Sequence, residues 1–533
     1  MFNKKCRENI FGGNNLPQED FNFDLIDYYF RNKDHADAFQ VLNDRFINDI
    51  DFHEVFAYID RTHSKIGQQY FFNKLLTIDK NTSFEKQETL IDIFLEKEAI
   101  KTKVQTLLAK FNKREAYYIS NLFIDEYIAK PKWFWVVNIL SVLGIVALGF
   151  VFVVNKVFIL LLFLFVINVM IHLWNKRNIM VYMDSIPQLY LLCNTASKLL
   201  NLNIDNQYNN SVAHSIRSLN ELKKKLFLFK FERKVTSDIE ALVLSFWEII
   251  KILFLIEPLV IFDVLKKLDK KRKDIQILFE YIGEFDSAIS IARLRMEIPY
   301  CCKPTISDSG NVFEFTNIYH PLIPDCVANS LKLTNKSILL IGSNMSGKTT
   351  FIRTVGINLL LAQTINTCFA KDFRLSQTRL FSAIRISDDL LNDKSYYFEE
   401  VLTIKNMVDE SHALFHNIFL LDEIFKGTNT IERIAAGKAV LSYLTKSTNN
   451  IVFVSTHDIE LFDFLSEEYD LYHFTEIIKA EQIYFDYKIK QGNLSTKNAI
   501  RILEMNGYPK TVIGEARRIS QILQNKHTKN GGF

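Results

Sequence analysis

The sequence predicts an α + α/β protein, in which an all-helical region carries an apolar helical hairpin and is followed by an α/β domain. Residues 20–128 and 179–297 have apolar residues three and four positions apart and few Gly or Pro, which is typical of packed helices. Residues 133–174 are almost entirely apolar. Beyond Tyr300, short apolar runs alternate with helical segments, which indicates a parallel sheet with crossover helices.

Length and composition limit the possible classes of protein. A chain of 533 residues is long enough for several domains. Its 48% hydrophobic and 23% charged residues lean slightly towards a membrane protein. The net charge of +3 excludes a strongly basic nucleic-acid binder, so any such binding depends on local patches. The six cysteines show no C-x-x-C spacing and are expected to be reduced thiols.

The apolar segment "WFWVVNILSVLGIVALGFVFVVNKVFILLLFLFVINVMIHLW" is predicted to be a transmembrane helical hairpin at residues 131–176. Asn155 and Lys156 divide it into runs of about 20 and 18 residues, at about 133–154 and 157–174, each near the length that spans a bilayer. Tryptophans stand at both outer ends, as is common at a membrane interface.

The charges around the hairpin predict its orientation. Four basic residues flank the outer ends against one lysine in the turn, so both flanks are expected in the cytoplasm: Lys130, Lys132, Lys176 and Arg177. The alternative is a buried helical hairpin inside a large soluble domain. That alternative is less favoured because the few polar residues, including Asn168 and His172, form no continuous stripe. The expected location is the cytoplasmic (inner) membrane, with both termini and the α/β domain on the cytoplasmic side.

The segment "LLIGSNMSGKTTF", residues 339–351, fits the phosphate-binding loop pattern G-x-x-x-x-G-K-[ST]. Backbone N–H groups of such a loop turn inward onto phosphates, assisted by the N-terminus of the following helix. Lys348 is expected to bind the β- and γ-phosphates of ATP, and Thr349 to ligate Mg²⁺. The predicted ATP-binding residues of the loop are Gly342, Ser343, Asn344, Met345, Ser346, Gly347, Lys348, Thr349 and Thr350.

Two further apolar runs end in residues that suit ATP hydrolysis. "NIFLLDEIFKGTNT" ends in Asp422 and Glu423, which we expect to hold Mg²⁺ and to orient or deprotonate the attacking water, respectively. The alternative for this acidic pair is a solvated cap at a strand end. "NIVFVSTHD" places His457 at the same edge of the predicted sheet, as a group that senses the γ-phosphate or orients the water.

Together these motifs resemble the MutS family of DNA mismatch repair ATPases. "GSNMSGKTT" is similar to the family's GPNMxGKS/T loop, and "DEIFKGTNT" to its DExGxGTS/T segment. "STHDIEL" resembles the ATHxxEL element, and "DDLLNDKSYYFEEV" resembles the inter-subunit signature near DDL…STFxxEM. The resemblance extends over most of residues 51–520, including a C-terminal segment that is similar to the family's helix-turn-helix.

The resemblance implies a homodimer in which the partner subunit completes each ATP site. Ser395 matches the signature serine that contacts the γ-phosphate from the partner, and Tyr487 falls where the family places a ring near the adenine. The other aromatic position holds Cys326, which implies weaker stacking on the base. The implied function is a dimeric ATPase clamp of DNA-binding ancestry, here tethered to a membrane.

Two departures from the family pattern weaken a mismatch-repair function. Only about 50 residues precede the core, too few for the family's mismatch-reading and connector domains. The hairpin lies where the family's DNA-gripping clamp is expected. The predicted divisions are therefore an N-terminal helical extension, two parts of a helical core separated by the hairpin, an ATPase domain and a C-terminal dimerisation segment: 1–50, 51–130, 131–176, 177–300, 301–490 and 491–533.

Three classes of function remain open at this point. The first is a dimeric ATPase clamp on duplex DNA, and the second is a membrane-anchored mechanical ATPase that moves a protein or lipid partner. An ABC transporter subunit is the weakest, because no LSGGQ-like signature occurs and two spans make a poor pathway. Basic runs at residues 223–234 and 266–273 suit DNA phosphates, anionic lipid headgroups or a solvated helical face.

Overall fold

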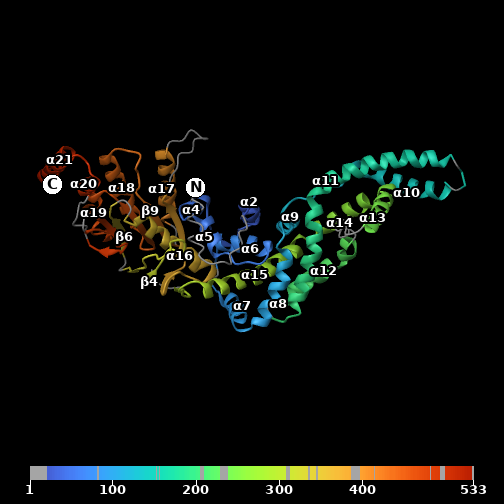
Figure 1. Ribbon diagram of the computed structural model, residues 1–533, viewed down its shortest axis with the longest axis horizontal. Coiled ribbons are helices and arrows are strands. Elements are labelled where there is room, and N and C mark those ends of the chain that lie inside the picture. Colours follow the sequence, from blue (N-terminus) through green and yellow to red (C-terminus); the bar gives the residue numbers. More distant parts are fainter. Residues whose placement is uncertain are drawn as a thin grey trace.

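The protein is elongated, with the α/β domain at one end, the apolar hairpin at the other and the remaining helices between them (Figure 1). This arrangement is seen in a computed structural model. The described residues are 21–80, 83–151, 153–154, 156–204, 209–227, 238–307, 312–333, 336–343, 346–385, 396–412, 415–479, 482–492 and 499–530.

Short helices and one small sheet make up the N-terminal part. Strands β1 (Ala38–Val41) and β2 (Thr77–Asp79), which the sequence did not predict, pair antiparallel. The helices of this part are α2 (Phe23–Ile26), α3 (Tyr28–Asn32), α4 (Asp44–Asp49), α5 (Phe52–Ile59), α6 (Lys65–Leu76), α7 (Glu85–Glu96), α8 (Glu98–Leu108) and α9 (Asn121–Ile124), with 3₁₀ turns at Ala109–Phe111 and Arg114–Ile119.

The helical core centres on the close packing of α6 against α15 (Arg272–Glu297). Asp286, which is fully buried in α15, accepts hydrogen bonds from the backbone N–H groups of His63 and Ser64, each at 2.8 Å. A Cβ on Gly67 would lie 2.1 Å from Oδ2 of Asp286, so the approach of the two helices requires glycine there. Because α15 runs from the core to the α/β domain, it joins the two regions (Figure 1).

The apolar segment forms two helices that lie side by side (Figure 1). A 3₁₀ turn at Lys132–Phe134 leads into α10 (Trp135–Phe150), and α11 runs from Val157 to Leu200. Two stretches, Lys132–Phe150 and Val157–Arg177, are long and apolar enough to cross a membrane, and only 28% and 17% of them are buried inside the protein. The rings of Trp133 and Trp174 lie 4.8 Å apart at the base of the hairpin.

Helix α11 does not end where the sequence predicted a division at residue 176. It continues without interruption into the second part of the helical core, where it packs on α12 (Asn209–Phe227). Helices α13 (Asp238–Leu253) and α14 (Ile256–Asp269) lie along the hairpin rather than beside α6 (Figure 1). The region after the hairpin is therefore divided between core helices and helices that accompany the hairpin.

The α/β domain contains a six-stranded sheet in the order β14-β11-β6-β10-β9-β8. All neighbours are parallel except the β14–β11 pair. The strands are β6 (Ser337–Ile341), β8 (Thr378–Ala383), β9 (His416–Asp422), β10 (Asn450–Thr456), β11 (Tyr469–His473) and β14 (Lys490–Gln491). The helices that accompany this sheet are α16 (Lys348–Ile365), α17 (Tyr396–Glu410), α18 (Thr430–Leu444) and α19 (Ile459–Leu465).

Smaller elements complete this end of the molecule. A four-stranded sheet has the order β3-β7-β4-β5, and β12 pairs with β13. Their bounds are β3 (Thr305–Ser307), β4 (Phe313–Ile318), β5 (Asn329–Lys332), β7 (Asp372–Ser376), β12 (Glu476–Lys479) and β13 (Gln482–Phe485). Helices α20 (Ala499–Met505) and α21 (Lys510–Asn530) contact each other at the C-terminal end.

Candidate functional site

The three apolar runs that the sequence singles out form the adjacent parallel strands β6, β10 and β9. Their carboxyl ends therefore lie together at one edge of the sheet, where α/β folds bind their ligands. The loop after β6 leads into α16, whose first residue is Lys348. Asp422 ends β9, and His457 directly follows β10. The fold thus brings together groups that are more than a hundred residues apart in the chain.

The loop after β6 has the close packing that a phosphate-binding loop needs. Gly347 has φ 104°, in the left-handed region that favours glycine. A Cβ on Gly342 would lie 2.7 Å from Oγ of Ser346, which is nearly fully buried and has no hydrogen-bond partner for that hydroxyl. A loop with no room for a side chain and with a buried, unsatisfied hydroxyl fits a polar ligand such as a phosphate.

Lys348 is buried at this edge of the sheet. Its Nζ donates to the carbonyl oxygens of Gly342 and Ser343 at 2.7 and 3.0 Å and lies 3.5 Å from Nε2 of His457. Burial lowers the pKa of Lys348, although nearby carboxylates oppose that shift. A partly desolvated ammonium group on a loop of this kind suits the binding of a polyphosphate.

Thr349 and Asp422 bring two oxygen ligands together. Oγ1 of Thr349 donates to Oδ2 of Asp422 at 2.6 Å, and the hydroxyl of Ser455 donates to Oδ1 of the same carboxylate. A hydroxyl and a carboxylate beside a phosphate-binding loop form the oxygen donor set that Mg²⁺ prefers. The residues present therefore fit Mg²⁺ with a nucleotide.

Both carboxylate oxygens of Glu423 are already engaged. Oε1 lies 2.6 Å from Nε2 of His457, and Oε2 lies 2.8 Å from Nζ of Lys426. The hydrogen bond with His457, assisted by Lys426, lowers the pKa of Glu423 to about 2 even though partial burial opposes the shift. Glu423 also has φ 53°, a strained backbone conformation of the kind that is concentrated at functional sites.

Tyr487 lies next to the loop. A Cβ on Gly347 would be 3.2 Å from Cδ1 of Tyr487, whose carbonyl accepts a hydrogen bond from Asn329 at 3.0 Å. Tyr487 is 44% exposed, so it is accessible to a ligand. Three of the predicted site residues, Asn344, Met345 and Ser395, lie outside the described residues.

Helix α17, which directly follows Ser395 in the sequence, packs on the loop after β9. The buried carboxylate of Glu400 accepts a hydrogen bond from the backbone N–H of Phe425. A Cβ on Gly427 would lie 2.7 Å from Cβ of Tyr397. The inter-subunit signature and the loop that carries Glu423 are therefore joined within one subunit.

The N-terminal helices also reach this site through Asp51. Oδ2 of Asp51 lies 3.1 Å from the guanidinium of Arg353, one turn beyond Thr349 in α16, and the same carboxylate pairs with Arg385. Arg385 is the last described residue before the signature segment. Asp51 thus links the helical core to α16 and to Arg385.

The sequence alone did not identify several of these contacts. Lys426 is three residues after Glu423 and Ser455 precedes "THD", so spacing could have suggested both. Glu476, which accepts a hydrogen bond from the loop residue Ser343 at 2.7 Å, lies 133 residues away and carries no motif. Only the fold reveals that contact.

Where the structure describes the basic runs, two of their lysines form ion pairs with carboxylates of the same protein. Lys267 lies 3.3 Å from Asp263, and Lys271 lies 3.5 Å from Glu221. These pairs favour a solvated helical face for the run at residues 266–273. The side chains of residues 223–225, and residues 230–234, lie outside the described part of the chain.

The fold and the site define an α/β domain whose loop after β6 suits a phosphate group, and comparison with known proteins shows which domain it matches. Residues 338–524 match the family model MutS domain V. The DNA mismatch repair protein MutS of Listeria welshimeri is 31% identical over 268 residues, which cover 48% of this chain and 30% of the relative. For the proteins of the same name from Clostridium botulinum and Aquifex pyrophilus, identity is 27% over 320 residues and 29% over 276 residues. These matches cover 57% and 50% of this chain, and 34% and 31% of the relatives.

Residues 338–524 therefore carry a domain that matches MutS domain V. The match spans about a third of the length of the curated relatives. One family feature is altered at the site: Phe425 stands where the DExGxGTS/T motif has its first glycine, and its φ is 61°. Phe425 therefore adopts the left-handed backbone conformation that usually favours glycine.

Proposed function

We propose that this protein is a Mg²⁺-dependent ATPase of the MutS type that works as a homodimer and is anchored in the cytoplasmic membrane by the α10–α11 hairpin. The observation that supports ATP hydrolysis most directly is the 2.6 Å contact between Thr349 and Asp422 beside the buried ammonium group of Lys348. That arrangement supplies two oxygen ligands for a metal ion and one cation for phosphates.

Each residue of the site has a separate task in the proposed reaction. Lys348 binds the β- and γ-phosphates, while Thr349 and Asp422 hold Mg²⁺, which neutralises phosphate charge when it is bound. Glu423 orients the attacking water and accepts its proton. His457 and Lys426 each occupy one carboxylate oxygen of Glu423. One of these two contacts must therefore break before Glu423 can bind the water.

Two observations support the membrane anchor. Most side chains of both apolar stretches face outward, with Ile159, Leu162 and Phe163 at least half exposed. Such a surface is costly in water and favourable among lipid acyl chains. The basic residues at both outer ends support a cytoplasmic position for the termini and the ATPase domain.

Two versions of this proposal differ in the partner on which the ATPase acts. The relatives carry the name DNA mismatch repair protein, which supports a clamp that acts on duplex DNA. The hairpin and the ion-paired lysines at 267 and 271 instead support a mechanical ATPase that acts on a protein or lipid partner at the membrane. We favour the second version, with DNA binding as the alternative.

The ATPase proposal is tested with two variants of the full-length protein in detergent. Lys348→Ala is expected to lose nucleotide affinity, whereas Glu423→Gln should bind ATP normally and lose turnover by about 100-fold or more. Lys332→Ala and Glu467→Gln, on exposed positions away from the site, are the matched controls. Near-normal turnover of Glu423→Gln would contradict the role given to that carboxylate.

A further inference from the structure

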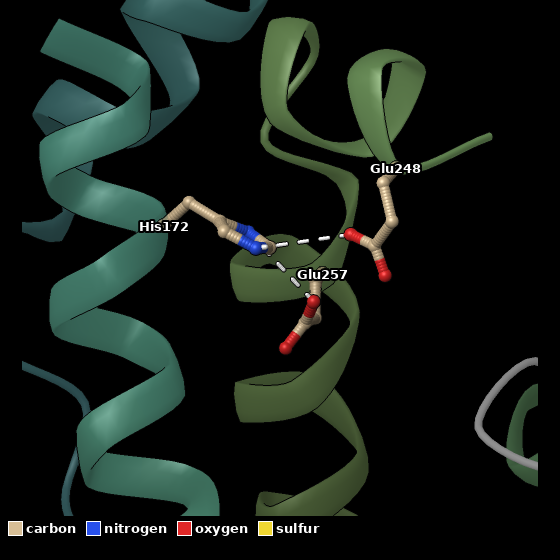
Figure 2. Close-up of side chains that lie close together, drawn as sticks. All are labelled: His172, Glu248 and Glu257. Carbon is tan, nitrogen blue, oxygen red and sulfur yellow. Dashed lines mark ion pairs between the residues drawn. The ribbon is translucent and has the colours of Figure 1, made fainter. Parts of the chain in front are cut away.

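A second cluster of titratable side chains lies far from the ATP site, at the base of the hairpin (Figure 2). His172 comes from α11, Glu248 from α13 and Glu257 from α14. The side chains of His172 and Glu257 are 4% and 2% exposed, and that of Glu248 is 33% exposed. Three separate helices thus direct an imidazole and two carboxylates into one largely buried space.

The separations within this cluster suit a shared ion. Nε2 of His172 lies 3.9 Å from Oε2 of Glu248, and Nδ1 lies 3.7 Å from Oε2 of Glu257. These distances exceed an ordinary hydrogen bond of about 2.7–3.2 Å. One ion can bind only one of the two imidazole nitrogens, so a shift of one carboxylate must bring its oxygen to the separation of about 3.4 Å that a tetrahedral ion with bonds of about 2.1 Å requires. One ligand atom from each residue lies within 4.8 Å of the others.

Neighbouring groups support the same interpretation. Asn168 and Asn175 lie four residues before and three residues after His172, and therefore on the same face of α11. Both are fully buried, and neither Oδ1 atom has a hydrogen-bond partner. A water bound to an ion could donate to such oxygens. Lys251 donates a hydrogen bond to Oε1 of Glu248 at 2.8 Å, and Nζ of Lys176 lies 3.9 Å from the same oxygen. The other oxygen, Oε2, is therefore the one that faces His172.

We propose that His172, Glu248 and Glu257 bind one divalent transition-metal ion that ties the hairpin to α13 and α14. One nitrogen and two carboxylate oxygens, with a remaining position for water, suit Zn²⁺ better than Mg²⁺, which prefers six oxygen ligands. The ion links three helices. Its role is structural and separate from the ATP site.

The test is a Zn²⁺ titration of chelator-treated, full-length protein in detergent with excess Mg²⁺ present. Wild type is expected to retain about one Zn²⁺ per chain and to unfold at a higher temperature with Zn²⁺ than without it. Glu257→Gln and His172→Ala should bind Zn²⁺ about 100-fold more weakly or worse, whereas His214→Ala, an exposed histidine on α12, should behave as wild type.

Equal Zn²⁺ binding by wild type and Glu257→Gln would overturn the site, as would no binding by wild type. In the latter case His172 lies between the two carboxylates without a metal ion. X-ray absorption of Zn²⁺-loaded wild type provides a measurement that does not depend on the folding of variants. It should show nitrogen and oxygen ligands, and a sulfur ligand or a shell of water alone would contradict the assignment.

An independent observation concerns the break between α13 and α14, which lies against the middle of both apolar helices. Oγ of Ser141 donates to the carbonyl of Phe254 at 2.8 Å, and Nδ2 of Asn168 donates to the carbonyl of Leu253 at 2.7 Å. A Cβ on Gly144 would lie 2.9 Å from the Leu253 carbonyl. Leu255 is fully buried with φ 49°, so the chain is not helical at that point.

Ser141 and Asn168 are near the midpoints of the two stretches long enough to cross a membrane. If those stretches cross a bilayer, as the proposed function requires, the break lies at membrane depth. Irregular backbone is tolerated there only where other protein groups satisfy its polar atoms, and Ser141 and Asn168 do so. The outer surface of α13 is apolar as well, with Phe246, Trp247 and Ile249 exposed by 66%, 38% and 50%.

We infer that α13 and α14 form a re-entrant helical pair that enters the bilayer from the cytoplasmic side and turns back at its centre. The exposed face of α13 contacts the acyl chains of the same lipids that surround the hairpin. This inference rests on the proposed membrane anchor, and its test must therefore report on the two separately.

The chain has four tryptophans, at residues 133, 135, 174 and 247, which makes quenching by lipids brominated along the acyl chain a direct measurement. One variant of the full-length protein keeps only Trp247, a second carries its only tryptophan at Leu143 in α10, and a third at Phe464 on α19. Quenching is expected for the first two and not for the third. Quenching at position 143 without quenching at 247 would overturn the re-entrant pair alone, whereas no quenching at either position would overturn the anchor as well.

Discussion

Nε2 of His457 lies 2.6 Å from Oε1 of Glu423, and this contact joins the ends of the neighbouring strands β10 and β9. It holds the proposed catalytic carboxylate in its ionised form. Since Lys426 binds the other oxygen, the structure shows Glu423 restrained on both sides.

Folding stability is expected to depend on the ionisation of Glu423 at acid pH. Its pKa falls from 4.5 to about 2 on folding, so the contact stabilises the native state above about pH 4.5 and is lost as pH falls towards 2. Glu423→Gln should therefore lose less stability than wild type between pH 5 and pH 2. Thermal unfolding at several pH values measures this, and parallel curves for the two proteins would contradict it.

Asp51 is expected to couple the helical core to the ATPase domain. Asp51→Asn keeps the side-chain shape and tolerates the local φ of 53° but loses the charge that binds Arg353 and Arg385. Because the pairs are partly buried, we expect a loss of about 1 kcal/mol in the free energy of unfolding. Asp44→Asn, at an exposed pair with Arg31, is the control and should change stability by less than about 0.5 kcal/mol. Equal effects of the two variants would be evidence against the coupling.

The proposed homodimer predicts that active sites are shared between subunits. A Lys348→Ala chain and a Ser395→Ala chain should each be inactive alone. When they are mixed, each heterodimer has one site with an intact Lys348 and an intact Ser395, so part of the ATPase activity should return. Mixtures as inactive as either parent would exclude a composite site.

The proposed anchor predicts an integral membrane protein whose ATPase domain faces the cytoplasm. Alkaline carbonate should leave the chain in the membrane pellet, and detergent should release it. In sealed vesicles of known orientation, protease should cut tags at both termini only from the cytoplasmic side. Recovery of the full-length chain in the soluble fraction would contradict the anchor, and cleavage of one terminus from the other side would contradict the topology.

Recognition of mismatched DNA is expected to be absent. Reading a mismatch requires an element that enters the duplex and exploits its easier kinking, whereas phosphate contacts carry no mismatch information. Any DNA binding should therefore depend steeply on salt and be nearly equal for a perfect duplex and one with a G·T mismatch. A competition assay in which the mismatch is preferred by more than about tenfold, or about 1.4 kcal/mol, would show the opposite.

The parts of the molecule that the sequence predicted depend on local patterns. Lys348, Thr349 and Asp422 belong to short motifs at the ends of apolar runs, and a parallel sheet brings such ends together whatever the rest of the chain does. The hairpin was predicted in the same way, from two long apolar runs separated by Asn155 and Lys156. Neither inference required contacts between distant residues.

The remaining features depend on tertiary contacts that no local pattern encodes. Residues 245–265 look like ordinary core helices, and only the bonds from Ser141 and Asn168 reveal a break held against the hairpin. His172 stood out merely as a polar residue in an apolar run until α13 and α14 placed two carboxylates beside it. The contact between Ser343 and Glu476 is hidden for the same reason.

Helix α11 runs without interruption from Val157 to Leu200, a length of about 66 Å at about 1.5 Å per residue. The helix is continuous from the half that belongs to the proposed membrane anchor to the half that packs on α12, although Pro187 lies inside it and an interior proline kinks a helix. A continuous helix passes on tilt. In the proposed anchor, a rotation of the core helices would swing the outer half of α11 through the bilayer and deform the lipids around it. The load on the proposed motor therefore includes the stiffness of the membrane itself.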